Sequence, residues 1–341
     1  MARVRIRDVA DAADVSITTV SLVLNNSDAR IPEKTRERVR AAAEALGYAP
    51  NQVARGLREK RTRTIGFISN QIATTPFAGR MILGVQDVAR EHGYLIILVD
   101  TGGDEETERE AIASLANQRV DRMIYASMWH QVVDRPKALP QDAVFLNCRP
   151  ADEKGVAVVP DDRAGGRLAT ERLLTAGHRR IAYLDAVSEP HPIATDLRYE
   201  GYCDALRQAG IEPEPRLRVS AEVSAQGGRE ATNRLFDLPS AECPTAVFCF
   251  NDRVAAGVYQ AAHRRGLLLP GDLSIVGYDD QQYVAAEQEP PLTTIALPHY
   301  AMGRWAMEQV LGVAPAWPAG PAHLMECPLV ERESVGPPSE A

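Results

Sequence analysis

The sequence predicts an α/β protein with a small all-helical segment at its N-terminus, and three observations support this fold class. Short amphipathic helical patterns fill residues 1–49, and a charged stretch follows them. From residue 64 onward, short apolar runs alternate with longer helical stretches, which favours right-handed βαβ units and parallel sheets. The alternation passes through two similar sets, at about 64–160 and 161–290, and therefore indicates two lobes.

The charge of the chain is divided unevenly along its length. The 341 residues carry a formal net charge of −8, which by itself argues against a nucleic-acid partner. Residues 1–62, however, contain 12 Lys or Arg and 8 Asp or Glu, a net charge of +4, so the rest carries −12. A small basic segment attached to a large acidic one is a known indication of nucleic-acid contact.

The sequence also predicts where the protein resides. No apolar signal-peptide core follows the first residues, and no apolar run approaches the roughly 20 residues that span a bilayer. The five cysteines are scattered without a CxxC pair, which favours reduced thiols. We therefore expect a cytoplasmic protein with no membrane partner.

Three helices are expected in the N-terminal segment, at 6–13, 17–24 and 32–46. Ser16 is a suitable N-cap for the second helix, because its hydroxyl can accept hydrogen bonds from the free amides there. Two short helices joined by a tight turn form a helix-turn-helix, whose second helix enters the major groove of DNA. Ile17, Thr18 and Ser21 are the exposed positions near its start. The pattern alone is more often plain core packing, so it does not decide the function.

Several residues at fixed spacing extend this pattern over about 55 positions. They are Asp8-Val9-Ala10, Val15-Ser16-(x2)-Thr19-Val20-Ser21-(x)-Val23-Leu24-Asn25 and Leu46-Gly47-Tyr48-(x)-Pro50-Asn51-(x2)-Ala54-Arg55-(x)-Leu57. This arrangement resembles the LacI/GalR family of bacterial transcription regulators. The resemblance implies a dimer that places two such segments on a pseudopalindromic DNA operator.

The resemblance also implies roles for individual residues. Ser16, Thr19 and Asn25 would hold phosphates, Ile17 and Thr18 would read bases, and residues 51–57 would form a hinge helix on DNA. Leu57 would be an apolar wedge that partly unstacks a base step in the minor groove. The candidate DNA-binding residues are Arg5, Ser16, Ile17, Thr18, Thr19, Ser21, Leu22, Asn25, Arg30, Asn51, Val53, Ala54 and Leu57.

Three residues depart from the family pattern. Arg5 stands where a capping Thr is usual, so the first helix loses this cap and gains a possible phosphate contact. Asp14 replaces the usual turn Gly, and Asp tolerates left-handed backbone better than most residues. Leu22 stands where many members have Arg; it would either touch a thymine methyl group or pack against the third helix. The operator half-site is therefore expected to differ from the commonest one in the family.

The remaining chain predicts the strands and helices of two α/β lobes. Strands are expected at 65–68, 95–99, 122–125, 143–146, 156–159, 181–184, 246–250 and 274–278. Helices are expected at 77–91, 105–118, 163–176, 197–209, 225–236 and 253–265. Ligands of such sheets bind beyond the carboxyl ends of the strands. Short polar residues follow most of these strands, which suits a polyhydroxylated ligand but is equally typical of helix N-caps.

The family resemblance continues through this region. The matching runs are Val159-Pro160-Asp161-Asp162-Arg163-Ala164-Gly165-Gly166, Gly177-His178-Arg179-Arg180-Ile181, Arg198-(x2)-Gly201-Tyr202, Phe250-Asn251-Asp252, Val276-Gly277-Tyr278-Asp279-Asp280 and Pro291-Leu292-Thr293-Thr294-Ile295. They resemble an effector-binding core built like periplasmic sugar-binding proteins. The resemblance implies that the effector binds between the lobes, and the candidate contacts are Thr75, Phe77, Trp129, Asn147, Arg198, Asn251, Asp279 and Tyr283. Arg198 could instead form an ion pair at a helix start.

These matches predict the domain organisation. A helix-turn-helix domain is expected at 1–49, a hinge helix and linker at 50–63, and an effector-binding and dimerisation core at 64–330. Lobe 1 would comprise about 64–160 plus 291–325, and lobe 2 about 161–290 plus 326–330. Residues 331–341 contain Pro337-Pro338 and no leucine heptads, so they predict a flexible tail and a dimer rather than a tetramer.

The sequence therefore predicts a DNA-binding repressor of carbohydrate-utilisation genes that is controlled by a sugar-like effector. A periplasmic sugar-binding protein would share the core but lack residues 1–57, and a non-sugar effector stays open because Arg198 also suits a phosphate or carboxylate. An enzyme is not expected, because the chain has no GxSxG, P-loop or HExxH motif. Neither a cofactor nor a metal site is expected, since the histidines do not cluster at metal-ligand spacing.

Overall fold

The computed structural model describes residues 4–24, 30–48, 61–75, 77–187, 191–318, 320 and 322–339. The chain divides into two compact units, residues 1–63 and 64–341, which are considered separately below. Among the described residues, no helix combines the length and the apolar character needed to cross a membrane. All five cysteines are free thiols.

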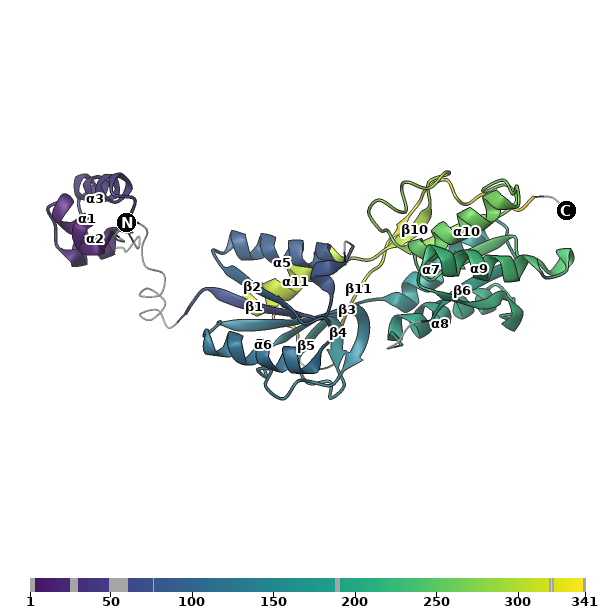
Figure 1. Ribbon diagram of the computed structural model, residues 1–341, viewed down its shortest axis with the longest axis horizontal. Helices are drawn as coiled ribbons and strands as arrows, with labels where there is room; N and C mark the ends of the chain where they lie inside the picture. Colours follow the sequence, from purple (N-terminus) through teal and green to yellow (C-terminus); the bar gives the residue numbers. More distant parts are fainter. Residues whose placement is uncertain are drawn as a thin grey trace. The chain divides into compact units, whose positions relative to one another are not determined.

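The described residues of the first unit form three short helices, and the predicted helix-turn-helix is confirmed (Figure 1). These are α1 (Ile6–Ala12), α2 (Ile17–Leu24) and α3 (Glu33–Ala45). They enclose a small apolar core formed by Val9, Ala10, Ala13, Val20, Val23, Val39 and Ala43. The Ser16 hydroxyl accepts a hydrogen bond from the amide of Thr19 at 3.0 Å, which confirms its capping role.

Two residues that depart from the family pattern are accommodated locally in this unit. Asp14, in the turn between α1 and α2, adopts a left-handed backbone with φ of +47°, as expected for a position that favours glycine. The first helix still has a partner at its start, because the carboxylate of Asp8 accepts a hydrogen bond from the amide of Arg5 at 2.7 Å. Asp8 thus satisfies one backbone amide at the start of α1, where the usual capping residue is absent.

The second unit consists of two lobes, each with a six-stranded sheet between layers of helices (Figure 1). In lobe 1 the strand order is β11-β5-β4-β3-β1-β2, and every neighbouring pair is parallel. The strands are β1 (Thr64–Ser69), β2 (Leu95–Asp100), β3 (Arg122–Val133), β4 (Val144–Pro150), β5 (Val156–Pro160) and β11 (His323–Met325). The helices are α5 (Gly79–Glu91), α6 (Glu105–Asn117) and α11 (His299–Leu311).

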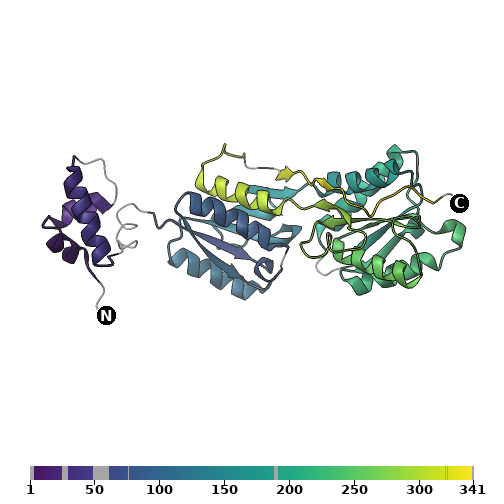
Figure 2. The same ribbon diagram turned by 90° about the horizontal axis from the view of Figure 1, so that it is seen from above.

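Helices α5 and α11 cover one face of this sheet, and α6 covers the other. Although about 200 residues separate α5 from α11 in the sequence, the two lie side by side in both views (Figure 2). Glycines allow this close approach, because a Cβ on Gly84 or Gly303 would collide with a carbonyl oxygen of the opposite helix.

Lobe 2 has the strand order β12-β10-β9-β8-β6-β7, parallel except for the β10–β12 pair. The strands are β6 (Ile181–Val187), β7 (Arg218–Glu222), β8 (Ala246–Cys249), β9 (Ser274–Asp279), β10 (Thr293–Ala296) and β12 (Leu329–Val330). Helices α7 (Asp162–Thr175) and α8 (Ile193–Gln208) cover one face, and α9 (Ala225–Phe236) and α10 (Asp252–Arg264) cover the other. In the described part of the chain, short 3-10 helices lie in connecting segments, at Ile72–Thr74 in lobe 1 and at Pro215–Leu217 and Ser240–Glu242 in lobe 2.

The lobe boundaries differ from those that the sequence predicts. Strand β10 pairs with β9 of lobe 2, so residues 291–296 belong to lobe 2 and the chain returns to lobe 1 only at α11. The chain then enters lobe 2 again between β11 and β12. It therefore passes between the lobes three times, after β5, after β10 and after β11.

The C-terminal segment also differs from the predicted flexible tail, because it is packed into lobe 2. The Ser334 hydroxyl is fully buried, accepts a hydrogen bond from the amide of Thr293 and donates one to the carbonyl of Ile275. The amide of Gly336 donates a hydrogen bond to the hydroxyl of Ser274, and its carbonyl accepts one from the His178 ring. The sequence did not predict this packing because individual side-chain and backbone hydrogen bonds hold the segment, with no periodic pattern.

Candidate functional site

The start of α2 presents the side chains expected to face DNA bases. Ile17 is 40% exposed and Thr18 is exposed, whereas Ser21 is half-buried. Leu22 is half-buried and lies outside the described apolar core of the helix-turn-helix. Ser16 and Thr19 are hydrogen-bonded to each other through their hydroxyls, and Arg5 and Arg30 are exposed. The candidates Asn25, Asn51, Val53, Ala54 and Leu57 lie outside the described residues.

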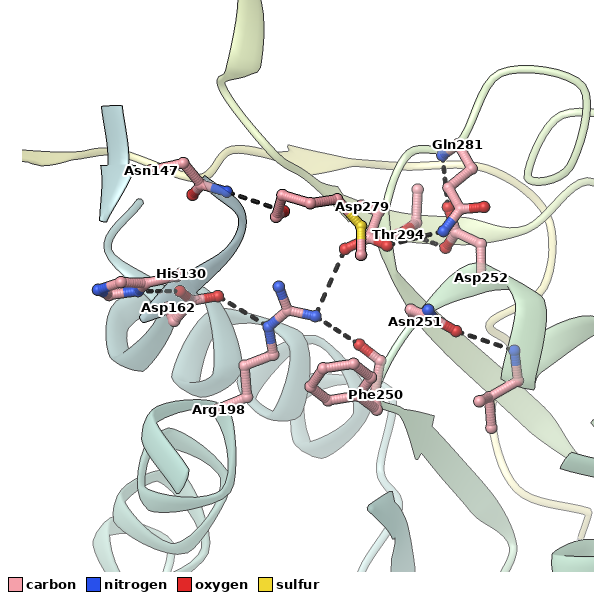
Figure 3. A network of polar contacts seen from close by, with 12 residues as sticks. His130, Asn147, Asp162, Arg198, Phe250, Asn251, Asp252, Asp279, Gln281 and Thr294 are labelled. Atoms are coloured by element: carbon pink, nitrogen blue, oxygen red, sulfur yellow. Dashed lines mark hydrogen bonds and ion pairs between the residues drawn. The ribbon is translucent and has the colours of Figure 1, made fainter. Parts of the chain in front are cut away.

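In the second unit, Arg198 is the centre of a buried polar network (Figure 3). It lies on α8 and is 3% exposed. Its Nε donates to Asp162 at 2.7 Å, and its Nη1 donates to the carbonyl of Phe250 at 2.7 Å and to Asp279 at 3.4 Å. The guanidinium also lies 3.6 Å from the ring centre of Tyr278 and 4.6 Å from that of Phe250. The ion pairs that the sequence left as an alternative for Arg198 are therefore present.

Glycines bring the backbone around Arg198 together. A Cβ on Gly166, in α7, would collide with the backbone of Arg198, and a Cβ on Gly165 would collide with the hydroxyl of Tyr278. A Cβ on Gly201 would in turn meet the carbonyl of Arg163. The double glycine of α7 thus allows α7, α8 and β9 to approach closely enough for Asp162 and Asp279 to flank one guanidinium.

Asp279 and Asp252 lie side by side on the lobe 2 edge of the network. The second oxygen of Asp279 accepts a hydrogen bond from Gln281 at 2.8 Å, and its backbone has φ of +101°. Burial raises the pKa of Asp279 to about 6, although Arg198 and Gln281 act in the opposite direction. Burial and the nearby Asp279 also raise the pKa of Asp252. One carboxylate oxygen of Asp252 accepts a hydrogen bond from the hydroxyl of Thr294, and the other accepts one from the backbone amide of Gln281.

Lobe 1 contributes the other side of the network. His130, on β3, contacts Asp162 through Nδ1 at 2.7 Å, and the Trp129 ring lies 6.3 Å from that of Phe250. Asn147, on β4, has a left-handed backbone with φ of +57° and donates from its amide to the carbonyls of Ser127 and Met128 at 3.0 Å.

Several buried polar atoms in and around this network have no hydrogen-bond partner among the described residues. They include Oδ1 of Asn147, Nδ2 of Asn251, Nε2 of His299 and the hydroxyl of Tyr278. Each belongs to a residue that is at most 2% exposed. An unpaired buried polar group costs free energy, so these atoms are candidates for hydrogen bonds to a ligand.

Two comparisons identify the domains. A family model described as bacterial regulatory proteins of the lacI family matches residues 5–51, and a periplasmic binding protein-like domain matches residues 170–335. The HTH-type transcriptional repressor PurR of Vibrio atlanticus is 34% identical over 311 residues, which cover 90% of each chain. The ribose operon repressor of Escherichia coli is 34% identical over 310 residues, which cover 89% of this chain and 91% of that protein. This chain belongs to the LacI family.

A solved structure extends this assignment to the fold of the regulator. The Lac repressor dimer bound to operator and the anti-inducer ONPF matches with a TM-score of 0.80 and 27% identity, over 98% of this chain and 100% of that one. The predicted family and fold are therefore confirmed. The regulator is a DNA-binding transcription factor with a small-molecule effector domain, and these relatives are named as repressors rather than enzymes.

The structure brings together most of the predicted effector residues of the regulator and separates a few. Trp129, Asn147, Arg198, Asn251 and Asp279 meet in or beside one network, and the Phe77 ring stacks on His299. In contrast, the Thr75 hydroxyl is used in a local turn with the Gln71 carbonyl, and Tyr283 is 77% exposed. The two residues therefore lie outside the network, and their contact with the effector stays a prediction.

Several residues in or beside the network were not predicted as effector contacts, among them His130, Asp162, Asp252, Gln281, Thr294 and His299. His130 lies beyond the predicted end of its strand, because β3 continues to Val133 past a register shift between Ala126 and Gln131. His299 lies at the start of α11, a helix that the sequence did not predict. The sequence shows His299 only as a lone histidine after an apolar run, and such a residue does not by itself indicate a binding site.

The acid stability of the regulator is expected to depend on His299. Burial lowers the pKa of His299 to about 4, although a long hydrogen bond to the carbonyl of Phe77 opposes the shift. Between about pH 6.5 and 4 the unfolded chain binds a proton here and the folded chain does not, so stability falls as the pH is lowered. From pH 7 to pH 5 this loss should be about 2 kcal/mol.

Chemical unfolding of the wild type and His299→Asn at several pH values between 4.5 and 7.5 measures this contribution. The variant should lose less stability on acidification, because asparagine does not titrate. Asp279 has the opposite sign, since its pKa is raised, but it is present in both proteins and cancels in the comparison. Parallel stability curves for the two proteins would show that His299 is not the acid-sensitive group.

Proposed function

We propose that this regulator binds a sugar at the junction of its two lobes, next to Arg198, and represses genes of carbohydrate use. The observation that carries the proposal is the set of unpaired polar atoms on Asn147, Asn251 and His299. A hydroxyl group donates and accepts hydrogen bonds at once, so neighbouring hydroxyls of a sugar can pair with the acceptor on Asn147 and the donor on Asn251. The rings of Phe77, Trp129 and Phe250 supply apolar surface beside them.

We further propose that two copies of the chain bind one pseudopalindromic operator, with the start of each α2 in the major groove. A two-fold dimer matches the symmetry of such a site. The exposed Ile17 and Thr18 and the basic charge of residues 1–62 support this arrangement. The Lac repressor, a dimer bound to operator and a small molecule, supplies a precedent for this chain.

Ligand screening by thermal unfolding tests the effector proposal, because a ligand that binds only the folded state raises the melting temperature. The panel should contain monosaccharides, disaccharides, sugar phosphates and nucleobases. We expect at least one uncharged sugar to stabilise the core. Stabilisation by phosphates or nucleobases alone would contradict the sugar assignment, and stabilisation by none of the compounds would contradict the proposed site.

The variant Asn251→Ser locates the binding site. Serine retains the N-cap function that Asn251 performs for α10, where the side chain accepts from the amide of Val254 at 3.0 Å, but it lacks Nδ2. We expect the variant to melt near the wild type and to bind the sugar at least about tenfold more weakly. Asn233→Ser, at an exposed position of α9, is the control. An operator titration at saturating sugar then tests coupling, and unchanged affinity would contradict it.

A further inference from the structure

One buried contact joins the two lobes through charged and polar side chains (Figure 3). His130 belongs to β3 of lobe 1, and Asp162 is the first residue of α7 in lobe 2. Nδ1 of His130 lies 2.7 Å from Oδ2 of Asp162, and the two side chains are 4% and 0% exposed. The contact is therefore shielded from water, where a hydrogen bond to a charged group is stronger than on the surface.

The same carboxylate holds Arg198. Burial alone would raise the pKa of Asp162, but the Arg198 guanidinium and the His130 hydrogen bond outweigh burial and lower the pKa below its ordinary value. Asp162 is thus ionised and acts only as an acceptor, so Nδ1 of His130 carries the proton and donates. Asp162 accepts from His130 on one oxygen and from Arg198 on the other.

A second contact between the lobes reaches the same arginine. Trp129, which precedes His130, packs against the ring of Phe250, and the carbonyl of Phe250 accepts from Nη1 of Arg198. The β3 segment that carries both residues lies where the register with β4 shifts, between Ala126 and Gln131. Two consecutive residues of lobe 1 thus contact two of the lobe 2 residues, Asp162 and Phe250, that hold the Arg198 guanidinium.

We propose that Trp129 and His130 form a latch that holds the lobes in this arrangement, and that His130 is a positioning residue for Arg198. When the lobes separate, Asp162 loses its second hydrogen bond and Phe250 loses its ring contact, so Arg198 becomes less constrained. The position of the lobes and the orientation of Arg198 are therefore coupled in the absence of any ligand. Only the consequence for effector binding rests on the proposed function.

Substitutions that keep or remove the Nδ1 contact test the latch. An asparagine amide nitrogen lies near the position of Nδ1, whereas a glutamine amide nitrogen lies near that of Nε2. His130→Asn should therefore retain the bond to Asp162, and His130→Gln and His130→Phe should lose it. His178→Gln is the matched control, because His178 is also a buried histidine with two hydrogen bonds, but both are within lobe 2.

Hydrogen exchange of the full chain, without ligand or DNA, measures the effect. In His130→Gln and His130→Phe, amides of residues 127–133 and 193–200 should exchange at least about tenfold faster, the change that loss of a hydrogen bond to a charged group produces. His130→Asn should stay near the wild type. His178→Gln should raise exchange around β6 and residues 334–336 and leave residues 127–133 unchanged.

Two outcomes would overturn the latch. One is unchanged exchange at residues 127–133 in both His130→Gln and His130→Phe, and the other is an equal increase in the Asn and Gln variants. If the Gln and Phe variants do not fold, Trp129→Leu supplies the same test, because it removes the ring contact with Phe250 and should raise exchange in the same two segments. Since no effector is used, failure of the latch is distinguishable from failure of the sugar proposal.

Discussion

Arg198→Met will lower the stability of the effector core by about 3–5 kcal/mol, because it leaves Asp162 and Asp279 buried without their cation. Methionine matches the length of the arginine stem and retains packing against Tyr278, so the change removes charge rather than volume. The effect should appear as a lower midpoint in chemical unfolding of residues 64–341. We also expect the variant to lose its response to the sugar.

The pH dependence of this difference identifies its origin. In the wild type the lowered pKa of Asp162 contributes stability that is present at neutral pH and lost as the carboxylate becomes protonated in acid. The gap between wild type and variant should therefore be largest near pH 7 and should shrink towards pH 4. Arg163→Met, which removes exposed ion pairs with Glu200 and Asp204, is the control and should change stability little. A gap independent of pH would show that lost packing, not charge, causes the destabilisation.

Val20→Asp will abolish specific operator binding while leaving the effector core intact. Val20 is fully buried in the core of α1, α2 and α3, and an unpaired carboxylate there costs more free energy than so small a core supplies. Operator affinity should fall by about 1,000-fold or more, to the level of nonspecific binding. Because residues 1–63 form a separate compact unit, the melting of residues 64–341 and their sugar affinity should not change.

Gel-shift titration at fixed salt, together with calorimetry of the same samples, measures both effects. The control Asp11→Asn changes an exposed residue of α1 and should bind the operator with at least wild-type affinity, because it removes a negative charge near DNA. Retained operator affinity in Val20→Asp would mean that DNA recognition does not depend on the packed helices. A lower melting temperature of the core would mean that the two units do not fold independently.

The sequence predicts helices with clear apolar spacing and caps well, but it does not predict α11 or the shortest strands. The ends of α2 and α9 coincide with their predicted limits, since apolar spacing and capping residues mark both. Strands β11 and β12 contain three and two residues, too few to show any alternation, and their places in the sheets come entirely from tertiary pairing. The lobe boundary was misplaced for the same reason, because the four residues of β10 carry no signal that shows which sheet they join.

The candidate site shows a similar division. Arg198, Asn251 and Asp279 were predicted because each follows a strand or matches a family motif. His130 was not predicted, because it lies on a strand that continues past a register shift. His299 was not predicted either, because it begins α11, which lies more than 150 residues after β3 in the sequence and packs against lobe 1. Such positions are determined by the packing of distant segments, about which local spacing contains no information.

The three passages of the chain between the lobes have a consequence for how such regulators can be recombined. Neither lobe is one continuous stretch of sequence, since lobe 1 needs α11 and β11 and lobe 2 needs β12 and residues 334–336. A chimera that exchanges one lobe must therefore join the two parents at three places. During synthesis, neither sheet can gain its last strand until the ribosome has added more than 320 residues. The two lobes therefore complete their folding together, after almost the whole chain has been made.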